Sequence, residues 1–329
     1  PRISFRILKE KKFLIFDAEE SSHLFNYLKK NETEILNTRK EIINFWILLK
    51  CFFNFKLSYK YYLIFYIKTI KPKIIITLID NNLFFYEIKK FYQCKTLSIQ
   101  RGLRTEYNDI FSSHQNKKKD LSCDAIFVWN EKLGKKYENL IKTKIEVIGS
   151  FVNNIEKKIE GEIIKRDILY ISTFRPNKDE KKIFKNLTWY DFIKNEPSLL
   201  KYLNNYCKKF NRKLSVIGRY DESNGEKDFF SKNFDNDLSF EYVKNHNQRD
   251  TYNICSNANL IITIDSTLGY EMLARGKKVA FFGLRPNLYP LNTRNFLYPE
   301  ISKKGKFWIN TERLSENEFL EIINYLNTV

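Results

Sequence analysis

The sequence predicts an α/β protein built from two doubly wound domains. Short apolar segments rich in β-branched residues alternate with helix-patterned segments along most of the chain, which is typical of parallel sheets covered by helices. Its 329 residues are too many for one ordinary core and suit two domains of roughly 150 residues each. Residues 262–283, ITIDSTLGYEMLARGKKVAFFG, read as one strand-helix-strand unit whose polar turn lies where open α/β sheets bind ligands.

The first half of the chain contains five predicted strands and the helices that connect them. FLIF ends at Asp17 and leads through a loop into a helix, and a long aromatic helical region follows around Trp46 to Tyr66. Residues 83–91 are predicted to be helical, as is the segment between the last two strands. The predicted strands are residues 13–16, 73–79, 96–99, 125–129 and 145–148.

The second half repeats the alternation after a charged segment that is poor in aromatic residues. This segment, residues 153–166, is predicted to be a linker between an N-terminal domain at 1–152 and a C-terminal domain at 167–329. Helices are expected near residues 198–210, 266–274 and 316–326. The predicted strands are residues 168–171, 214–217, 240–243, 260–264 and 279–282.

The charge of the chain predicts an anionic partner without choosing among the kinds of anion. The formal net charge is +18, which attracts nucleic acid, an anionic membrane surface or a phosphorylated small molecule. The abundance of Lys, Asn, Ile, Phe and Tyr is also what an AT-rich coding sequence produces. Composition alone therefore leaves the partner open.

The cysteines and the apolar segments predict the cellular location of the protein. Its five cysteines are widely spaced and form no Cys-x-x-Cys pair, so neither a disulfide framework nor a zinc site is expected, and a reducing cytoplasm fits. The start of the chain lacks the pattern of a signal peptide. Lysines interrupt the most apolar stretch, residues 42–70, before it reaches the ~20 residues of a membrane span. We expect a soluble or peripheral protein at the inner face of the plasma membrane.

The turn before the helix at 266–274 has the groups that bind a phosphate. Unpaired backbone amides, the hydroxyls of Ser266 and Thr267 and the positive end of the helix dipole converge there. The alternative is that Asp265 or Ser266 only caps the helix. Glu271 lies one helical turn beyond Thr267 on the same face, where a carboxylate can meet a ribose hydroxyl. Together these contacts predict a nucleotide site.

Residues 260–282 resemble the donor-nucleotide segment of GT-B glycosyltransferases of bacterial surface carbohydrate biosynthesis, related to the Kdo and polysialic acid transferases. LSIQRGLRTEYNDIF, CDAIFVWNEKLGKKYE and IEVIGSFVNN resemble, in order, the second half of that group's N-terminal domain. The resemblance covers residues 73–282. It implies a GT-B fold, with two Rossmann-like domains facing across a cleft, and a metal-independent enzyme without a cofactor that moves a sugar from a nucleotide-sugar to a surface glycan or lipid-linked acceptor.

The resemblance also implies residue roles at the donor site. Related enzymes often have a His-Pro pair in this domain, whereas here a lone histidine is followed by asparagine, which leaves CMP-Kdo or another CMP-nonulosonate as an open choice of donor. Two arginines at predicted strand ends are placed to neutralise a phosphate or a donor carboxylate, or are ordinary surface residues. The expected donor-site residues are Ser266, Thr267 and Gly269 at the phosphate, Glu271 at the ribose, Arg219 and Arg175 at the anion, and His246.

An inverting transfer needs a base for the acceptor hydroxyl, and in GT-B enzymes the N-terminal domain supplies it. Asp80 is the first candidate because it ends the strand ITLI, although it could equally cap the helix that follows. Gln100 and Arg101 are expected on the acceptor side. The remaining carboxylates at predicted strand ends or on the Arg101 loop are Asp17, Glu20 and Glu106, with Glu19 and Asp109 beside them.

A metal-dependent transferase is not expected. The sequence has one Asp-x-Asp motif, Asp235-Asn236-Asp237, and it precedes a predicted strand instead of following one. We interpret it as a solvated turn. In a GT-B enzyme a helix dipole and basic side chains stabilise the leaving phosphate in place of a metal ion.

Two other classes of function remain as alternatives. Nucleic-acid binding would follow from the charge and the 16% aromatic content, but the aromatic residues occupy apolar-periodic positions and no nucleic-acid motif appears. A nucleotide-sugar epimerase or a polyol-phosphate transferase would use the same architecture. An NAD enzyme is disfavoured because no Gly-x-Gly-x-x-Gly follows a strand.

Overall fold

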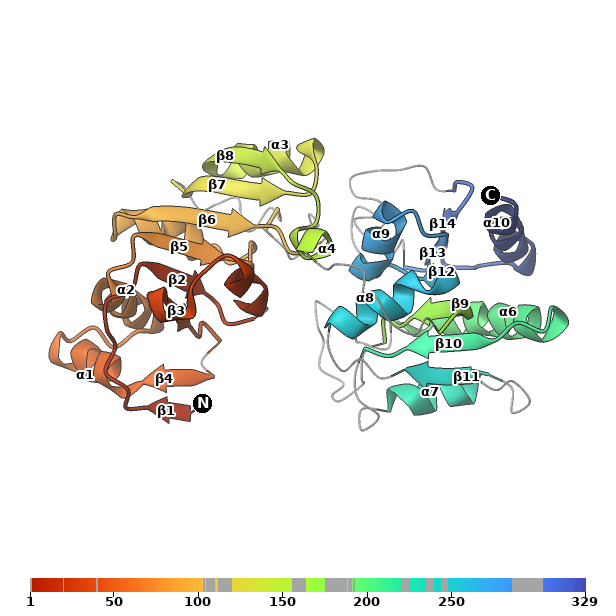
Figure 1. Ribbon diagram of the computed structural model, residues 1–329, viewed down its shortest axis with the longest axis horizontal. Helices are drawn as coiled ribbons and strands as arrows, with labels where there is room; N and C mark the ends of the chain where they lie inside the picture. Colours follow the sequence, from red (N-terminus) through yellow and green to blue (C-terminus); the bar gives the residue numbers. More distant parts are fainter. Residues whose placement is uncertain are drawn as a thin grey trace. The chain divides into compact units, whose positions relative to one another are not determined.

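A computed structural model of the chain separates into two compact units, Pro1–Ile155 and Glu156–Val329. The division falls within residues 153–166, where the sequence analysis places a linker. Each unit contains its own six-stranded sheet (Figure 1). The structure describes residues 2–19, 21–39, 41–102, 104, 110–111, 120–155, 164–174, 188, 191, 193–219, 225–234, 240–243, 248–285 and 304–329, with the backbone alone for 248–250.

The N-terminal unit has an all-parallel sheet in the order β3-β2-β5-β6-β7-β8. The chain moves from β2 to one neighbour, β3, and later returns to β5 on the other side, so the strand order reverses between β2 and β5. Its strands are β1 Arg2–Ser4, β2 Phe13–Phe16, β3 Thr33–Leu36, β4 Ile42–Asn44, β5 Ile74–Thr77, β6 Lys95–Ile99, β7 Ser122–Val128 and β8 Lys142–Val147.

Alternate residues of the buried strands supply cores on the two faces of this sheet. Leu14 and Phe16 of β2 pack into one core together with side chains of α2, whereas Ile15 packs into a second core with Leu24. A strand covered on both faces is therefore apolar at every position, as in FLIF. The helices are η1 Ser21–Asn26, η2 Lys30–Glu32, α1 Phe45–Phe53, α2 Tyr59–Ile70, η3 Phe85–Lys90, α3 Glu131–Leu140 and α4 Phe151–Ile155.

The helical region expected around Trp46 to Tyr66 is confirmed, and in the structure it consists of two helices, α1 and α2. Asn44 caps α1 by accepting a hydrogen bond from the Ile47 amide at 3.2 Å, and Ser58 caps α2 in the same way. Both residues are strong helix starters, and the second one allows the chain to turn before α2. Within the helical segment predicted at residues 83–91, the structure has the short 3-10 helix η3 at Phe85–Lys90.

The C-terminal unit has a second parallel sheet in the order β11-β10-β9-β12-β13-β14. Numbered along the chain this is 3-2-1-4-5-6, the order of dinucleotide-binding folds, and the reversal lies between β9 and β12. Its elements are β9 Arg166–Ile171, α6 Glu196–Lys209, β10 Leu214–Ile217, α7 Glu226–Asn233, β11 Phe240–Val243, α8 Gln248–Ser256, β12 Ala258–Thr263, α9 Thr267–Ala274, β13 Val279–Gly283, β14 Trp308–Asn310 and α10 Glu316–Thr328.

The predicted α/β class with two doubly wound sheets is confirmed, and ten strands lie where the sequence places them. The sequence analysis missed β3, because its central Glu34 looks like a surface residue. In the structure Glu34 is buried and its carboxylate pairs with Arg6 at 2.5 Å, a contact between residues 28 positions apart. Within the described residues, no helix has the length and apolar character needed to span a membrane.

Candidate functional site

The reversal point of the C-terminal sheet brings three strand ends together. Ser172 and Thr173 follow β9, Asp265 and Ser266 follow β12, and Arg285 follows β13. Because β9, β12 and β13 are parallel neighbours, these residues share one edge of the sheet. In open α/β sheets this edge, at the reversal of strand order, is where ligands bind.

The first turn of α9 has no side-chain cap. Ser266 occupies the N-cap position with extended backbone, but its hydroxyl makes no capping hydrogen bond. The Ser266 amide instead donates to Thr263 Oγ1 at 3.4 Å, and residues 265–268 are half-buried. Ser266 therefore occupies the N-cap position as predicted, but its side chain does not cap the helix. The positive end of the helix dipole is compatible with an anion.

Arg285 connects the three strand ends through its side-chain contacts. It was not among the site residues predicted from the sequence. Its side chain is buried and pairs with Asp265 at 3.1 Å while donating to Thr173 Oγ1 at 3.0 Å. Arg285 directly follows the apolar segment VAFFGL, so it is expected to lie near the core. A buried arginine is almost always paired with an acidic group. That position is the one local signal that could have found it.

Glu271 lies on the same helix and is already engaged within the protein. It is buried, and its carboxylate accepts a hydrogen bond from the Tyr252 hydroxyl of α8. The Arg275 guanidinium lies over the Tyr252 ring, 4.8 Å from its centroid. Glu271 is thus held in a fixed orientation one turn from the start of α9, and its contact with a ribose stays a prediction.

Gly269 serves to pack α9 against the sheet. It is buried, and a Cβ at this position would lie 2.8 Å from Thr263 Cγ2 and 3.1 Å from Phe281 Cε1. The side of Gly269 on which other residues carry a Cβ therefore faces β12 and β13. This close approach is reason enough for a glycine here, and a contact between Gly269 and the donor phosphate stays a prediction.

Substituting Gly269 with alanine is expected to destabilise the C-terminal unit by about 1–3 kcal/mol, the usual cost of inserting a methyl group into a packed core. Urea unfolding measures the loss. Adding Thr263→Ser removes the methyl group that the new Cβ would meet, while a hydroxyl remains to bond the Ile171 carbonyl. The double variant should regain part of the stability, and no recovery would argue against the packing role.

Two further carboxylates are buried at the C-terminal sheet. Glu226 begins α7 and accepts hydrogen bonds from the Ser172 hydroxyl, from the Arg219 amide at 3.0 Å and from Tyr242 Oη at 3.1 Å. It fixes the backbone at the end of β10, where the Arg219 side chain is exposed. The other two predicted donor-site residues, Arg175 and His246, lie outside the described residues.

Glu196, the first residue of α6, is buried with only one of its carboxylate oxygens hydrogen-bonded within the described residues. It is 1% exposed; Oε1 accepts a hydrogen bond from the Tyr170 hydroxyl at 2.5 Å, and Oε2 has no partner among the described residues. Burial raises the pKa of Glu196 to about 7, and the charge of Arg285 opposes that rise in part. Sequence reasoning missed Glu196, because a glutamate at a helix start usually is exposed.

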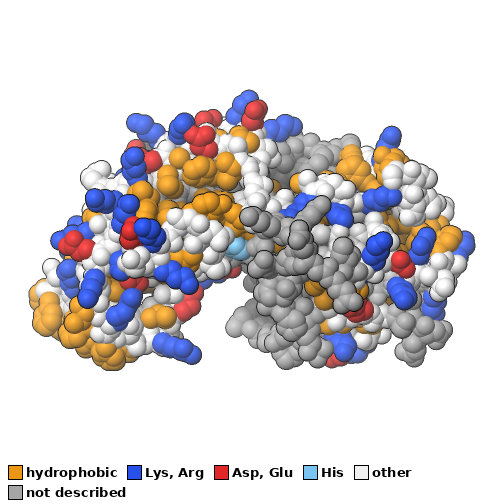
Figure 2. All heavy atoms as spheres, in the orientation of Figure 1, with side chains coloured by type: hydrophobic (Ala, Val, Ile, Leu, Met, Phe, Trp, Pro, Cys, Tyr) orange, Lys and Arg blue, Asp and Glu red, His pale blue; other side chains and the backbone are white. Residues whose placement is uncertain are grey.

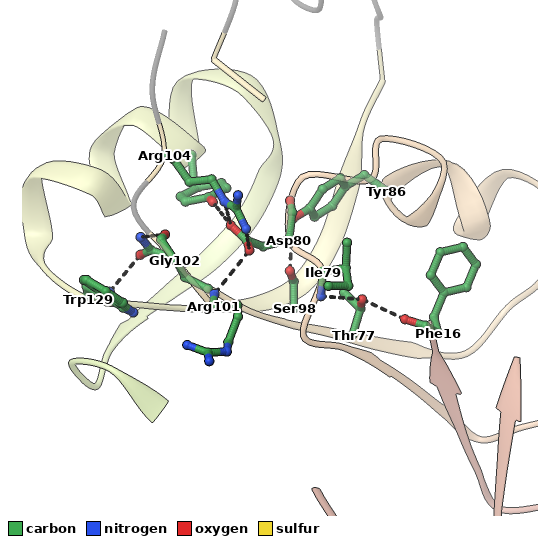
Figure 3. Close-up of polar contacts among 12 residues, drawn as sticks. Phe16, Thr77, Ile79, Asp80, Tyr86, Ser98, Arg101, Gly102, Arg104 and Trp129 are labelled. Atoms are coloured by element: carbon green, nitrogen blue, oxygen red, sulfur yellow. Dashed lines mark hydrogen bonds and ion pairs between the residues drawn. The ribbon is translucent and has the colours of Figure 1, made fainter. Parts of the chain in front are cut away.

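In the N-terminal unit, the Asp80 carboxylate is fully buried and surrounded by donors (Figure 3). Arg104 donates from both Nε, at 2.6 Å, and Nη2, and the Arg101 amide donates at 3.2 Å. The Tyr137 hydroxyl also donates, and burial raises its pKa far above the usual value, so it keeps its proton. Tyr86 bonds the Asp80 carbonyl at 2.6 Å.

This geometry argues against Asp80 as the catalytic base. A base needs an accessible lone pair within reach of the substrate proton, whereas both oxygens of Asp80 accept hydrogen bonds from the protein and neither is exposed. The capping alternative does not fit either, since Phe84 occupies the N-cap of η3. Asp80 instead holds the chain at Arg101 to Arg104, and we assign it a positioning role.

The two predicted acceptor-side residues have different environments. Gln100 is buried, donating to the Gly102 carbonyl and accepting from the Trp129 amide, both at 2.9 Å. It therefore links the ends of β6 and β7, and these two hydrogen bonds engage its side-chain amide within the protein, without an acceptor substrate. Arg101 is half-buried, and its guanidinium points away from the Asp80 carboxylate (Figure 3).

A pocket of about 500 Å³ opens at the reversal point of the N-terminal sheet, beside the ends of β2, β3 and β5. The Asp17 carboxylate there accepts hydrogen bonds from the Glu19 amide at 2.9 Å, from Arg39 Nε at 3.2 Å and from the Thr38 hydroxyl. Two other candidate bases, Glu20 and Glu106, lie outside the described residues. The lining residues are Asp17, Thr38, Arg39, Ile79, Asn81, Asn82, Leu83 and Phe84.

Most of the residues that line this pocket were not predicted from the sequence. Asp17 was among the predicted residues, but Thr38 and Arg39 follow the strand β3, which was not predicted. The pair Asn81-Asn82, directly after the strand ITLI, was a usable signal. Within the described part of the chain, no group of three His, Cys, Asp or Glu side chains could hold a metal ion, and Asp235 to Asp237 fall outside it.

The fold resembles solved structures of two kinds of enzyme. The chain aligns with a UDP-GlcNAc 2-epimerase from Methanocaldococcus jannaschii, solved with UDP-GlcNAc and UDP, over 95% of this chain and 92% of that one, with a TM-score of 0.55 and 12% identity. It aligns with the wall teichoic acid polymerase TagF over 97% of this chain and 82% of that one, with a TM-score of 0.51 and 11% identity. At such identities the likeness shows the fold, and the predicted GT-B architecture is confirmed.

Sequence comparisons place the chain more narrowly. No curated protein matches it. A family model described as "putative O-antigen biosynthesis protein" matches residues 97–329, which is more than two thirds of the chain and includes the whole C-terminal unit. The chain therefore belongs to this family of O-antigen biosynthesis proteins.

Proposed function

We propose that the protein is a glycosyltransferase that moves a sugar from a nucleotide-sugar to a growing surface glycan or lipid-linked acceptor. The observation that carries the proposal is the uncapped start of α9 at the reversal point of a 3-2-1-4-5-6 sheet, a position suited to a nucleotide phosphate. Membership of an O-antigen biosynthesis family fits such a reaction. The finer assignments, which are the donor, the acceptor and the base, are parts of this proposal.

The donor site needs neither a metal nor a cofactor in this proposal. The amides and hydroxyls at Ser266 and Thr267 meet the phosphate, and the dipole of α9 stabilises the charge that develops on the leaving nucleotide. Arg219 adds a cation at the end of β10, and Glu271 accepts hydrogen bonds from the ribose. Arg285 and Asp265 hold this edge in shape, because they join the strands that present these groups.

The acceptor is proposed to bind in the pocket of the N-terminal unit. Its lining offers the Arg39 guanidinium, the Asn81 and Asn82 amides and the Asp17 carboxylate, a set suited to hydroxyl-rich or phosphorylated groups. The base is sought at Glu20 and Glu106. Asp17 is less suited, because its carboxylate is 3% exposed and both of its oxygens accept hydrogen bonds from the protein, as in Asp80. CMP-Kdo and other CMP-nonulosonates remain candidate donors.

A nucleotide screen in EDTA tests the proposal. CMP, UDP, GDP and dTDP are each added to the protein, and the melting temperature is measured, since a ligand that binds the folded state stabilises it by RT ln(1 + [L]/Kd). One nucleotide is expected to stand out, and no response to any would overturn the donor site. Its sugar derivatives are then incubated without acceptor; conversion to the C2 epimer would identify an epimerase, and stronger stabilisation by random DNA would favour nucleic-acid binding.

Replacing Glu271 with glutamine is expected to weaken binding of the selected nucleotide by about 1–3 kcal/mol, because an amide replaces the charged acceptor for the ribose. Titration of the nucleotide measures the loss. The matched control is Tyr252→Phe, which removes the internal hydrogen bond to Glu271 and leaves the carboxylate. An equal loss of affinity in both variants would mean that Glu271 acts through the structure and does not contact the ribose.

A further inference from the structure

A set of large apolar side chains is exposed on the N-terminal unit around α1 and β1. Phe55 is 93% exposed, and Leu57 and Phe53 are 74% and 71% exposed. Figure 2 shows hydrophobic side chains gathered over α1 and β1 at the lower left. Exposed apolar patches mark interaction sites. We call this set the α1 surface: Ile3, Phe5, Ile7, Ile42, Trp46, Phe52, Phe53, Phe55 and Leu57.

The α1 surface belongs to an ordered part of the fold. Strand β1 pairs in parallel with β4, and Trp46 Nε1 donates to the Phe5 carbonyl at 2.8 Å. The Phe5 and Phe45 ring centroids lie 5.0 Å apart, and the Asn44 side chain donates to the Arg6 carbonyl at 2.7 Å. These contacts fix β1 against the start of α1, so the outward direction of the apolar side chains is built into the fold.

The turn after α1 presents Phe55 at a cost in backbone energy. Phe55 has φ of 52°, in the left-handed region that bulky residues rarely adopt. Its amide donates to the Phe52 carbonyl at 2.9 Å, and the Lys56 amide donates to the Cys51 carbonyl at 3.0 Å, which closes the turn. No packing around Phe55 offsets the strain, since the side chain is almost wholly exposed. Strain of this kind is commonly retained for function.

The charge on the α1 and α2 side of this surface is positive, whereas Glu41 is exposed beside Ile42 at its other end. Residues 42–79 contain no aspartate or glutamate, and their lysines are Lys50, Lys56, Lys60, Lys68, Lys71 and Lys73. Lys56 and Lys60 are exposed at the turn itself, and Lys56 Nζ lies 4.9 Å from the Tyr61 ring centroid. Exposed Phe, Trp and Leu side chains beside lysines are the composition of helices that lie in a membrane interface.

We propose that the α1 surface docks the protein onto an anionic membrane, with the Phe52 to Leu57 turn inserted among the acyl chains and the lysines at the lipid headgroups. The proposal does not extend to α2, because its residues Tyr62, Tyr66 and Ile67 are buried in the core and cannot face lipid. A second copy fits less well, since a symmetric contact would bring the same lysine-rich face against itself.

Vesicle flotation tests the docking and requires no catalysis, so its failure is distinct from failure of the proposed transfer. Vesicles of phosphatidylglycerol and phosphatidylcholine are compared with pure phosphatidylcholine at low and high salt. The protein should float with the anionic vesicles and less at high salt, where charge attraction is screened. The variant Phe53→Ser with Phe55→Ser should lower the membrane partition coefficient roughly tenfold or more for each side chain, since burying a phenylalanine is worth at least that factor.

The matched control is Phe210→Ser, an exposed aromatic side chain on the C-terminal unit that is 47% exposed. It should float like the unaltered protein. Melting temperatures of all variants establish that they are folded. The proposal is overturned if the protein floats with neither vesicle, if the double variant floats equally well, or if light scattering shows a dimer that the double variant loses, which would identify a second copy as the occupant.

Discussion

Asparagine in place of Asp80 is expected to destabilise the N-terminal unit by about 3–5 kcal/mol, because it leaves the Arg104 guanidinium without its buried counter-ion. The side chain of Arg104 is 13% exposed and that of Asp80 is 0% exposed, so water cannot replace the lost partner. Asparagine keeps the shape of the side chain but offers one acceptor oxygen where two are used. The melting temperature should fall by roughly 2–4 °C for each kcal/mol.

A double-mutant cycle with Arg104→Met separates the ion pair from the other contacts of Asp80. Removing the arginine alone strands a buried carboxylate and should cost a similar amount, whereas the double variant should be more stable than the sum of the two losses predicts. Asp17→Asn serves as a comparison, since its carboxylate also accepts several hydrogen bonds but faces a pocket. A stable Asp80→Asn protein with turnover lowered roughly 10²-fold would restore Asp80 as the base.

Glutamine in place of Glu196 is expected to remove a pH dependence of stability. The pKa of this carboxyl is about 7 in the folded protein against a usual value of 4.5, so between these pH values the folded state keeps a proton that the unfolded state releases. Stability from this group is therefore present below about pH 4.5 and is lost as pH rises to about 7. At about 1.4 kcal/mol per pH unit, the loss is on the order of 3 kcal/mol.

The measurement compares urea unfolding of the unaltered protein and Glu196→Gln at pH 5, 6, 7 and 8. Other carboxylates contribute equally to both proteins, so the difference isolates Glu196. The variant should match the unaltered protein near pH 5 and exceed its stability at pH 8. Tyr170→Phe is a useful control because it removes the hydrogen bond to Glu196 Oε1 and keeps the titrating group. A difference that does not change with pH would show that Glu196 is ionised in the folded protein.

The alternation of strands and helices was readable because it depends on local pattern. Strands covered on both faces are apolar at every position, as in residues 13–16 and 279–283, and helices start and end at recognisable caps. The edge that we propose to bind the donor was predicted for the same reason, since a polar turn follows an apolar strand at Asp265 and Ser266. The 3-10 helix η3 and the break between α1 and α2 were not predicted, although Ser58, the N-cap of α2, was a local signal for the second of these.

The roles of single polar residues depended on partners distant in sequence. Asp80 looked like a base until Arg104 and Tyr137, the latter 57 positions away, were seen to saturate it. Gly269 was predicted to contact a phosphate, and only the folded chain shows that Thr263 and Phe281 fill the space beside it and require a glycine for packing. The exposure of a side chain and the identity of its partner are both properties of the folded chain.

Local sequence pattern was enough to predict the α/β class, the two sheets, the polar turn at one edge of the C-terminal sheet and the basic, aromatic character of residues 42–70. Each follows from the period of apolar residues or from composition, which neighbouring positions encode. Only the tertiary structure decided that Arg285 joins three strand ends, that Asp80 is buried in an ion pair and that Phe53 and Phe55 face outward while Tyr66 does not. Burial and pairing arise when segments far apart in the chain meet, so no local pattern records them.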